Sequence, residues 1–201
     1  MRVVIPFDAT TPKSRLSTIL DGDERASFAR EMLRDVIESV TAADLSPTVV
    51  STEPVDVDVP VTVDDRRLTP LINDVIAEGV PVAVVMADLA NVTPAAVRRL
   101  VRADGDVVIA PGRGGGTNAL VVRDEDFSVD YHGVSFRDHR TNAAAIGADL
   151  TVIDSFRLAT DVDERSDLVE VLLHGTGDAA DWLRAAGVRI EVDGDRPSVE
   201  R

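Results

Sequence analysis

Two kinds of hydrophobic pattern alternate along the chain: short β-branched runs, and longer stretches whose apolar residues recur three and four positions apart. The first kind predicts strands and the second predicts amphipathic helices. The predicted strands span residues 3–7, 48–50, 59–63, 81–86, 106–110, 118–122, 150–153 and 188–192. The predicted helices span residues 24–40, 68–78, 136–146, 166–173 and 178–186, and one more begins at Thr93-Pro94.

The order of these elements predicts the fold class. Residues 81–86 are apolar on both faces, which is typical of a central strand in a parallel sheet covered by helices on both sides. Repeated strand–helix alternation predicts a three-layer α/β/α fold with a mostly parallel sheet. No linker divides the chain, so we expect one domain over residues 1–201, with residues 188–201 as an edge strand or tail.

Composition excludes several classes of protein. With 44% hydrophobic residues the chain can bury a core, yet no apolar run approaches the ~20 residues of a membrane-spanning helix. The absence of cysteine excludes disulfides, thiolate metal sites and a cysteine nucleophile. The first residues lack the apolar region of a signal peptide. We therefore expect a soluble cytoplasmic protein.

The net charge of the chain limits which partners we expect and indicates the salt concentration at which the protein works. A formal net charge of −15 repels nucleic-acid phosphates and anionic lipids, so neither nucleic acid nor membrane is an expected partner. Lys13 is the single lysine among 21 basic residues. An acidic, lysine-poor chain is typical of proteins that work at high salt, where screening shortens the Debye length to ~3 Å at about 1 M. A high-GC genome, which also favours arginine, is the alternative explanation.

Basic residues follow the first predicted strand. The loop that begins near Pro6 carries Lys13 and Arg15, and ligands of open α/β sheets bind at the carboxyl ends of strands. Lysine offers a point charge and arginine a two-pronged donor, so the pair suits a phosphate chain. The alternative is a solvated turn. The loop has neither the Walker nor the dinucleotide-binding glycine pattern.

Acidic residues stand at two other positions where strands or extended segments end. Asp88 comes directly after the buried strand 81–86, and carboxylate oxygens are the ligands that Mg²⁺ prefers. Asp161 and Asp163 are one residue apart, so an extended backbone points both to the same side. The alternatives are a loop aspartate that caps the next helix, and an acidic helix N-terminus.

A glycine run provides the candidate anion site. Gly114, Gly115 and Gly116 let backbone N–H groups approach an anion closely, and Thr117 and Asn118 add side-chain donors. A flexible hairpin turn is the alternative. Further along the chain, Gly133 and Ser135 precede a predicted helix, which Ser135 is expected to cap. The three histidines have no metal-binding spacing, and we expect none of them to be a ligand: His132, His139 and His174.

Together these segments resemble one family. Pro12-Lys13-Ser14-Arg15-Leu16, Met86-Ala87-Asp88-Leu89, Gly114-Gly115-Gly116-Thr117-Asn118-Ala119-Leu120, Ser135-Phe136 with His139, and Asp161-Val162-Asp163 are similar to segments of the 2-phospho-L-lactate guanylyltransferases of coenzyme F420 biosynthesis. The resemblance implies a GT-A-like nucleotidyltransferase fold. It also implies that GTP and 2-phospholactate condense to lactyl-2-diphospho-5′-guanosine and pyrophosphate. Some relatives use phosphoenolpyruvate or 3-phosphoglycerate instead.

The resemblance and the residue types together predict the site. Mg²⁺ is expected on Asp88, Asp161 and Asp163, and Lys13, Asp88 and Asp163 are the expected catalytic residues. The expected nucleotide contacts are Pro6, Lys13, Arg15 and Asn73, and the expected acceptor-phosphate contacts are Gly115, Gly116, Thr117, Asn118, Gly133 and Ser135. The chain departs from the family at Asp8, where lysine is common.

Two other functions remain open at this stage. One is a nucleotidyltransferase of the same fold with another acceptor, such as a molybdopterin or a sugar phosphate. The other is a non-catalytic nucleotide-binding protein, which Mg²⁺-dependent turnover would exclude. The oligomeric state is also open, with a homodimer as one option, because small enzymes of this type often dimerise.

Overall fold

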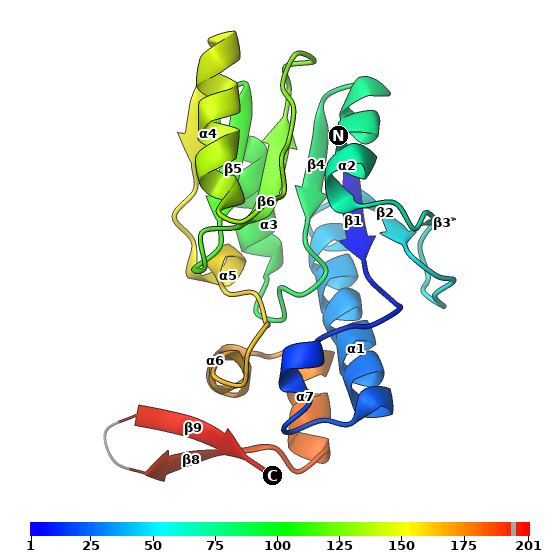
Figure 1. Ribbon diagram of the computed structural model, residues 1–201, viewed down its shortest axis with the longest axis vertical. Helices are drawn as coiled ribbons and strands as arrows, with labels where there is room; N and C mark the ends of the chain where they lie inside the picture. The colour runs from blue at the N-terminus through cyan, green and yellow to red at the C-terminus, as the bar shows by residue number, and fades with distance from the viewer. Residues whose placement is uncertain (194–195) are drawn as a thin grey trace.

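A seven-stranded sheet forms the centre of the computed structural model, which describes residues 1–193 and 196–201 (Figure 1). The strands lie in the order β3-β2-β1-β4-β6-β5-β7. They are β1 (Arg2–Phe7), β2 (Ser46–Ser51), β3 (Val61–Val63), β4 (Val82–Val85), β5 (Val107–Pro111), β6 (Thr117–Val122) and β7 (Leu150–Val152). All neighbouring pairs are parallel except those of β6, which runs antiparallel to both β4 and β5. The predicted mostly parallel sheet is confirmed.

Helices cover both faces of this sheet. The longer ones are α1 (Gly22–Thr41), α2 (Leu68–Ala77), α3 (Pro94–Arg102), α4 (Ser135–Ile146), α6 (Asp167–His174) and α7 (Asp178–Ala185), with the short α5 (Phe156–Ala159) and a 3₁₀ turn at Ser14–Leu16. Helices α2 and α4 lie on one face of the sheet, and α1 and α3 lie on the other (Figure 1). Each face has its own apolar core, and the core on the α1 side continues beyond the sheet to α6 and α7, of which α7 packs against α1. The three-layer α/β/α prediction is therefore confirmed.

Local sequence explains why these elements form. All four residues of β4 are buried because both faces of the central sheet are covered. Helix α1 begins with a capping box, in which Asp21 and Glu24 each accept a hydrogen bond from the other's backbone N–H. Helix α3 begins with Thr93 as its cap and Pro94 in its first turn.

The end of the chain differs from the prediction. The segment predicted as an edge strand forms β8 (Arg189–Asp193), which pairs antiparallel with β9 (Arg196–Glu200) and not with the main sheet. This hairpin packs against α6, and Val199 of β9 is fully buried there. Residues 194 and 195 of the predicted segment lie outside the described residues. The backbone of β8 is hydrogen-bonded to β9, and the hairpin buries apolar surface against α6. Pairing with the edge of the main sheet is therefore not required for its stability.

The reversed direction of β6 determines where its ends lie. Because β6 is antiparallel to β4, its first residues lie beside the carboxyl end of β4, with Val85 opposite Ala119 and the Met86 N–H donating to the Asn118 carbonyl. The loop after β1, the segment after β4 and the glycine loop before β6 therefore meet at one edge of the sheet. Among the described residues, no helix is both long and apolar enough to span a membrane.

A buried aspartate joins α1 to α7 and should be important for stability. Asp35, only 6% exposed, accepts hydrogen bonds from the N–H groups of Asp178 (2.7 Å) and Ala179 (3.1 Å) at the start of α7. Gly177 lies so close that an added Cβ would be 2.2 Å from the Asp35 Oδ1. We expect Asp35→Ala to lower the free energy of unfolding by about 2–3 kcal/mol, because two buried donors lose their acceptor.

Melting curves should be recorded in high salt above pH 7. There the Asp35 carboxyl, whose pKa burial raises to about 6, is ionised. Gly177→Ala should also destabilise the protein, because its Cβ would overlap the carboxylate. The control is Asp181→Ala on the exposed side of α7, for which a change within about 0.5 kcal/mol is expected. Equal melting temperatures for Asp35→Ala and Asp181→Ala would contradict the proposed role of Asp35.

Candidate active site

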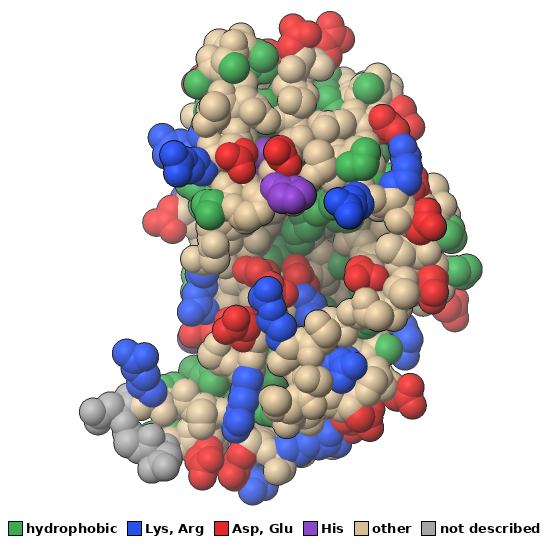
Figure 2. All heavy atoms as spheres, viewed as in Figure 1, with side chains coloured by type: hydrophobic (Ala, Val, Ile, Leu, Met, Phe, Trp, Pro, Cys, Tyr) green, Lys and Arg blue, Asp and Glu red, His purple; other side chains and the backbone are tan. Residues whose placement is uncertain are grey.

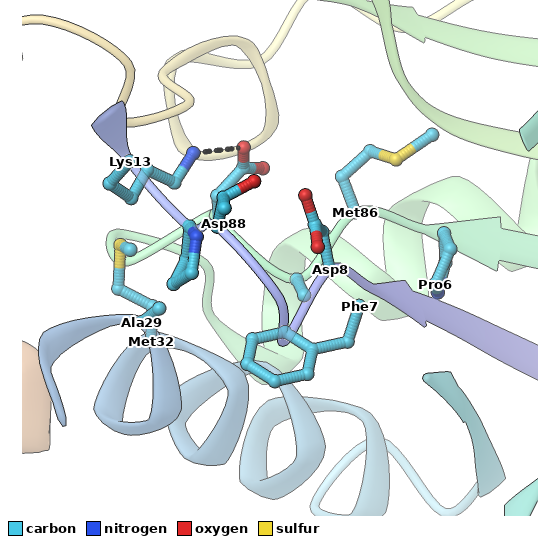
Figure 3. Close-up of a pocket in the computed structure, with 11 residues that line it drawn as sticks. Pro6, Phe7, Asp8, Lys13, Ala29, Met32, Met86 and Asp88 are labelled. Carbon is cyan, nitrogen blue, oxygen red and sulfur yellow. Dashed lines mark hydrogen bonds and ion pairs between the residues drawn. The ribbon is translucent and has the colours of Figure 1, made fainter. Parts of the chain in front are cut away.

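Two adjoining cavities form a cleft at the carboxyl edge of β1 and β4. They share four lining residues, Pro6, Phe7, Asp8 and Met86. The first cavity, of about 170 Å³, contains Lys13 and Asp88 (Figure 3). The second, of about 330 Å³, extends over the ends of β2 and β3. Figure 2 shows this side of the molecule hollowed at its middle, with acidic and basic side chains gathered along the lower rim of the hollow.

The single lysine of the chain lies in the first cavity between two carboxylates. Lys13 Nζ donates to Asp88 Oδ2 at 2.7 Å (Figure 3). It also donates to Asp163 Oδ1 at 3.1 Å. Burial by itself would lower the pKa of Lys13, but the charges and hydrogen bonds of Asp88 and Asp163 raise it above its ordinary value. The ammonium group therefore stays charged. It connects residues 75 and 150 positions away in the sequence.

The predicted carboxylates come together around this lysine. The Val162 N–H donates to the Asp88 carbonyl at 3.2 Å and the Val162 side chain is fully buried. On either side of it, Asp163 contacts Lys13 and Asp161 contacts Asn118. Burial raises the pKa of Asp161, and the nearby charges of Asp88 and Asp163 raise it further, although a hydrogen bond from Asn118 lowers it. Lys13 thus pairs with two of the three carboxylates, Asp161 lies close enough to feel the charges of both, and negative charge is in excess.

One oxygen of this cluster lacks a partner. Asp88 Oδ1 is buried and has no hydrogen-bond partner among the described residues. A buried carboxylate oxygen without a partner is costly, and a cation would satisfy it. In the described part of the chain, no three acidic or histidine side chains are already arranged around a common metal position. Instead, the Lys13 ammonium lies between two of these acids.

Arg15 adds a second positive charge at the mouth of the cleft. Its guanidinium lies 3.6 Å from Asp163 Oδ2, and its side chain is 67% exposed. The 3₁₀ turn at Ser14–Leu16 presents it, and Lys13 precedes this turn with a left-handed backbone (φ 54°). An exposed arginine can move towards an incoming anion with little loss of ion-pair energy.

The glycine loop packs directly against the start of α4. The Phe136 N–H donates to the Gly115 carbonyl at 3.1 Å. Gly115 has φ +85°, and an added Cβ would be 2.9 Å from the Val134 side chain, so this approach requires glycine. The prediction that Ser135 caps the helix is wrong, because Ser135 is the first helical residue and Val134 holds the cap position. Helix α4 has no side-chain cap within the described structure. The N–H groups of Phe136 and Arg137 already donate to the carbonyls of Gly115 and Val134, so among the first three N–H groups of the helix only that of Ser135 has no backbone partner among the described residues.

Behind the glycine loop, Thr117 contacts a histidine. Thr117 Oγ1 lies 2.9 Å from His139 Nδ1, and both residues are buried. Burial lowers the pKa of His139 to about 4, so the ring is neutral near pH 7. Sequence reasoning counted His139 among the non-ligands and among the residues that resemble the family, but did not connect it with Thr117. The available signal was its position on α4, one helical turn after Ser135.

The other predicted contacts lie in different surroundings. Asn73 uses both polar atoms of its amide on the backbone of Val129, with bonds of 2.8 and 3.1 Å, and so holds α2 against the segment before α4. Asn118 donates to Asp161 Oδ1 at 3.0 Å and so belongs with the carboxylates, not with the free donors of the glycine loop. Gly116 accepts from the Gly112 N–H within the loop, and Gly133, with φ +49°, precedes α4.

Solved structures place this architecture among the nucleotidyltransferases. A predicted nucleotide-diphospho-sugar transferase from Desulfovibrio desulfuricans G20 superposes with a TM-score of 0.73 at 14% identity, over 92% of this chain and 95% of that one. A nucleotidyl transferase from Methanothermobacter thermautotrophicus superposes with a TM-score of 0.59 at 17% identity, over 91% and 98% of the two chains. At such low identity these likenesses show the fold, and the predicted nucleotidyltransferase fold is confirmed.

The sequence itself defines the family within that class. The family model described as "Guanylyl transferase CofC like" matches residues 1–201, and the chain belongs to this family. A 2-phospho-L-lactate guanylyltransferase from Halomicrobium mukohataei is 60% identical over the whole of both chains. One from Natronomonas pharaonis is 59% identical over 100% of this chain and 99% of its own. The predicted family is confirmed, and these halophilic relatives agree with the high-salt interpretation of the charge.

Proposed function

We propose that this protein transfers GMP from GTP to (2S)-2-phospholactate, releasing pyrophosphate and forming lactyl-2-diphospho-5′-guanosine for coenzyme F420 biosynthesis. The observation that carries the proposal is the position of Lys13 among Asp88, Asp161 and Asp163, at the same sheet edge as the glycine loop. One end of the cleft suits a triphosphate and its cation, and the glycine loop with the start of α4 suits a second anion. The names of the relatives support the choice of substrates.

The chemistry agrees with the residues in the cleft. An oxygen of the acceptor's phosphate attacks the α-phosphorus of GTP, and the bond from this phosphorus to the bridging oxygen of the β-phosphate breaks, so pyrophosphate leaves. The attacking oxygen is already ionised near neutral pH, and no general base is required. What the reaction needs is neutralisation of two anions and their in-line alignment.

The acidic cluster fits a divalent cation, for which we propose Mg²⁺. Asp88, Asp161 and Asp163 would hold it, because they supply hard oxygen ligands, carry excess negative charge and include the partnerless Asp88 Oδ1. When bound, the ion supplies positive charge to the phosphates. Lys13 and Arg15 would then bind the phosphates that leave as pyrophosphate.

The acceptor's phosphate is proposed to bind between the glycine loop and α4. Gly115, Gly116 and Gly133 let backbone N–H groups approach it, and the hydroxyls of Thr117 and Ser135 add donors. The positive end of the 12-residue α4 faces the same region. A small, highly charged acceptor suits this arrangement better than a large uncharged one.

The guanine base is proposed to lie in the second cavity, where Asp64 and Arg66 line the wall. Asp64 is 19% exposed, and its pKa is lowered by hydrogen bonds from Arg66, so it stays ionised. A carboxylate pairs with the N1–H and amino group of guanine, whereas adenine presents an acceptor at N1. Asn73, whose amide bonds Val129, is not included in this site.

This placement predicts an effect on nucleotide choice. We expect Asp64→Asn to lower the ratio of kcat/KM for GTP to that for ATP by about 10- to 100-fold, because a charge-assisted hydrogen bond to guanine is lost. The control is Asp74→Asn, which also removes an ion-pair partner of Arg66 but lies outside the cavity lining. A ratio unchanged in Asp64→Asn would place the base elsewhere.

The function is tested by pyrophosphate release in molar KCl with Mg²⁺ and GTP. 2-Phospholactate, phosphoenolpyruvate and 3-phosphoglycerate are supplied in separate assays. Release with 2-phospholactate that EDTA abolishes is the expected result. Release only with another of the three acceptors would change the proposed substrate. Nucleotide binding without turnover, by protein shown to be folded at that salt, would favour a non-catalytic role.

A further inference from the structure

The tautomer of His139 is determined by its surroundings. His139 Nε2 lies 3.0 Å from the backbone nitrogen of Asp130, which carries a hydrogen and can only donate. Nε2 must therefore accept, and in a neutral ring the proton resides on Nδ1. The ring is completely buried, with the edges of Tyr131 and Phe127 packed at centroid distances of 5.0 and 6.1 Å. It cannot turn over without losing the bond from Asp130.

This tautomer decides what the Thr117 hydroxyl can do. His139 Nδ1–H donates to Thr117 Oγ1 across 2.9 Å, so the oxygen is an acceptor in this bond. A hydroxyl has one proton, and that proton must then point away from the histidine. No other partner of the Thr117 hydroxyl is present among the described residues. The remaining donor stands at the first position of β6, directly after the glycine loop.

We propose that His139 is a positioning residue for the acceptor: it forces the Thr117 hydroxyl to donate towards the acceptor's phosphate. The inference rests on the proposed function, since it requires an anion between the glycine loop and α4. An ionised phosphate has only acceptor oxygens, so a hydroxyl held as a donor binds it better than one free to rotate. Histidine thus contributes to anion binding while it remains neutral and out of reach of the substrate.

The charged groups around the ring are consistent with this role. Asp130 and Asp138 act on His139 through their charges and would favour its protonation, but burial opposes them and has the larger effect on the pKa. Protonation would place a second hydrogen at Nε2, facing the Asp130 N–H. The same backbone contact therefore selects the tautomer and disfavours the charged ring.

Two isosteric substitutions separate the two bonds of His139. In His139→Asn the amide nitrogen takes the place of Nδ1 and can still donate to Thr117. In His139→Gln the amide oxygen takes the place of Nε2 and can still accept from Asp130, but the donor to Thr117 is lost. We expect His139→Gln to raise KM for the acceptor about tenfold with little change in KM for GTP, and His139→Asn to stay within about threefold of wild type.

Thr117→Val should reproduce the His139→Gln effect, and the double variant should be no worse than either single one, because both remove the same interaction. A wild-type KM in His139→Gln together with a raised KM in Thr117→Val would overturn the inference and leave the proposed function intact. An equal rise in the acceptor KM in His139→Gln and His139→Asn would also overturn the inference, because it would show that the ring acts only through packing.

Nitrogen-15 NMR of the histidines gives a readout independent of turnover. The Nδ1–H tautomer is expected for His139 near pH 7, with His139→Asn used to assign the signal. An Nε2–H tautomer overturns the inference whatever the activity, and it does so even if the variants fail to fold. If wild-type protein shows the Nδ1–H tautomer but no turnover with any of the three acceptors, the proposed function fails, and the inference about the acceptor fails with it.

Discussion

Replacing Asp88 with asparagine is expected to lower kcat for pyrophosphate release by about 10²–10³-fold or more. Asparagine keeps the size of the side chain but removes the charge that pairs with Lys13 at 2.7 Å. It also removes the anionic ligand that the proposed cation site requires. The loss should appear in kcat, because negative charge on the phosphates must be neutralised while the bond to the acceptor oxygen forms and the bond to pyrophosphate breaks.

Initial rates at saturating GTP and acceptor measure this effect, and melting curves at the same salt show whether the variant is folded. The matched control is Asp104→Asn, an exposed acid before β5, for which wild-type turnover is expected. Turnover of Asp88→Asn within a few-fold of wild type would refute the assignment of Asp88 to the reaction centre.

Replacing Lys13 with methionine is expected to have two opposite effects. Turnover should fall on the order of 10²-fold, because the charge proposed to bind the leaving phosphates is lost. Affinity for Mn²⁺ in the absence of nucleotide should rise, because the ammonium lies 2.7 and 3.1 Å from two of the carboxylates proposed to hold the metal. At the proposed site, lysine and metal would compete for these oxygens.

Titration of Mn²⁺, followed by electron paramagnetic resonance in high salt, measures the second effect without any turnover. Arg15→Met is the control, since Arg15 is exposed and 3.6 Å from Asp163, and a change in Mn²⁺ affinity of less than about threefold is expected. Unchanged or weaker Mn²⁺ binding in Lys13→Met would show that the lysine and the metal do not share this site.

The regular elements were largely predictable because their hydrophobic patterns are local. The strand predicted at residues 81–86 is β4 (Val82–Val85), and the helix predicted at residues 68–78 is α2 (Leu68–Ala77). The 3₁₀ turn at Ser14–Leu16, the four-residue α5 and β9 were not predicted. These elements are too short to show a period, and β9 depends on its pairing with β8.

The candidate site was predictable where ligand-binding residues follow strands. Lys13 and Asp88 were selected in this way, whereas Asp161 and Asp163 were selected because residues two positions apart in an extended segment point to the same side. The structure brings all four together. Their roles in binding and catalysis stay predictions. Asn73 could not be judged from the sequence, because its partner Val129 is 56 residues away.

The sequence by itself determined the order of strands and helices, the mostly parallel α/β class and the family, since each of these depends on residue patterns that are local or shared with relatives. Only the tertiary structure decided that the Lys13 ammonium lies between Asp88 and Asp163, and that His139 donates to Thr117. Hydrogen bonds and ion pairs form over about 3 Å, and only packing brings residues far apart in the chain that close together.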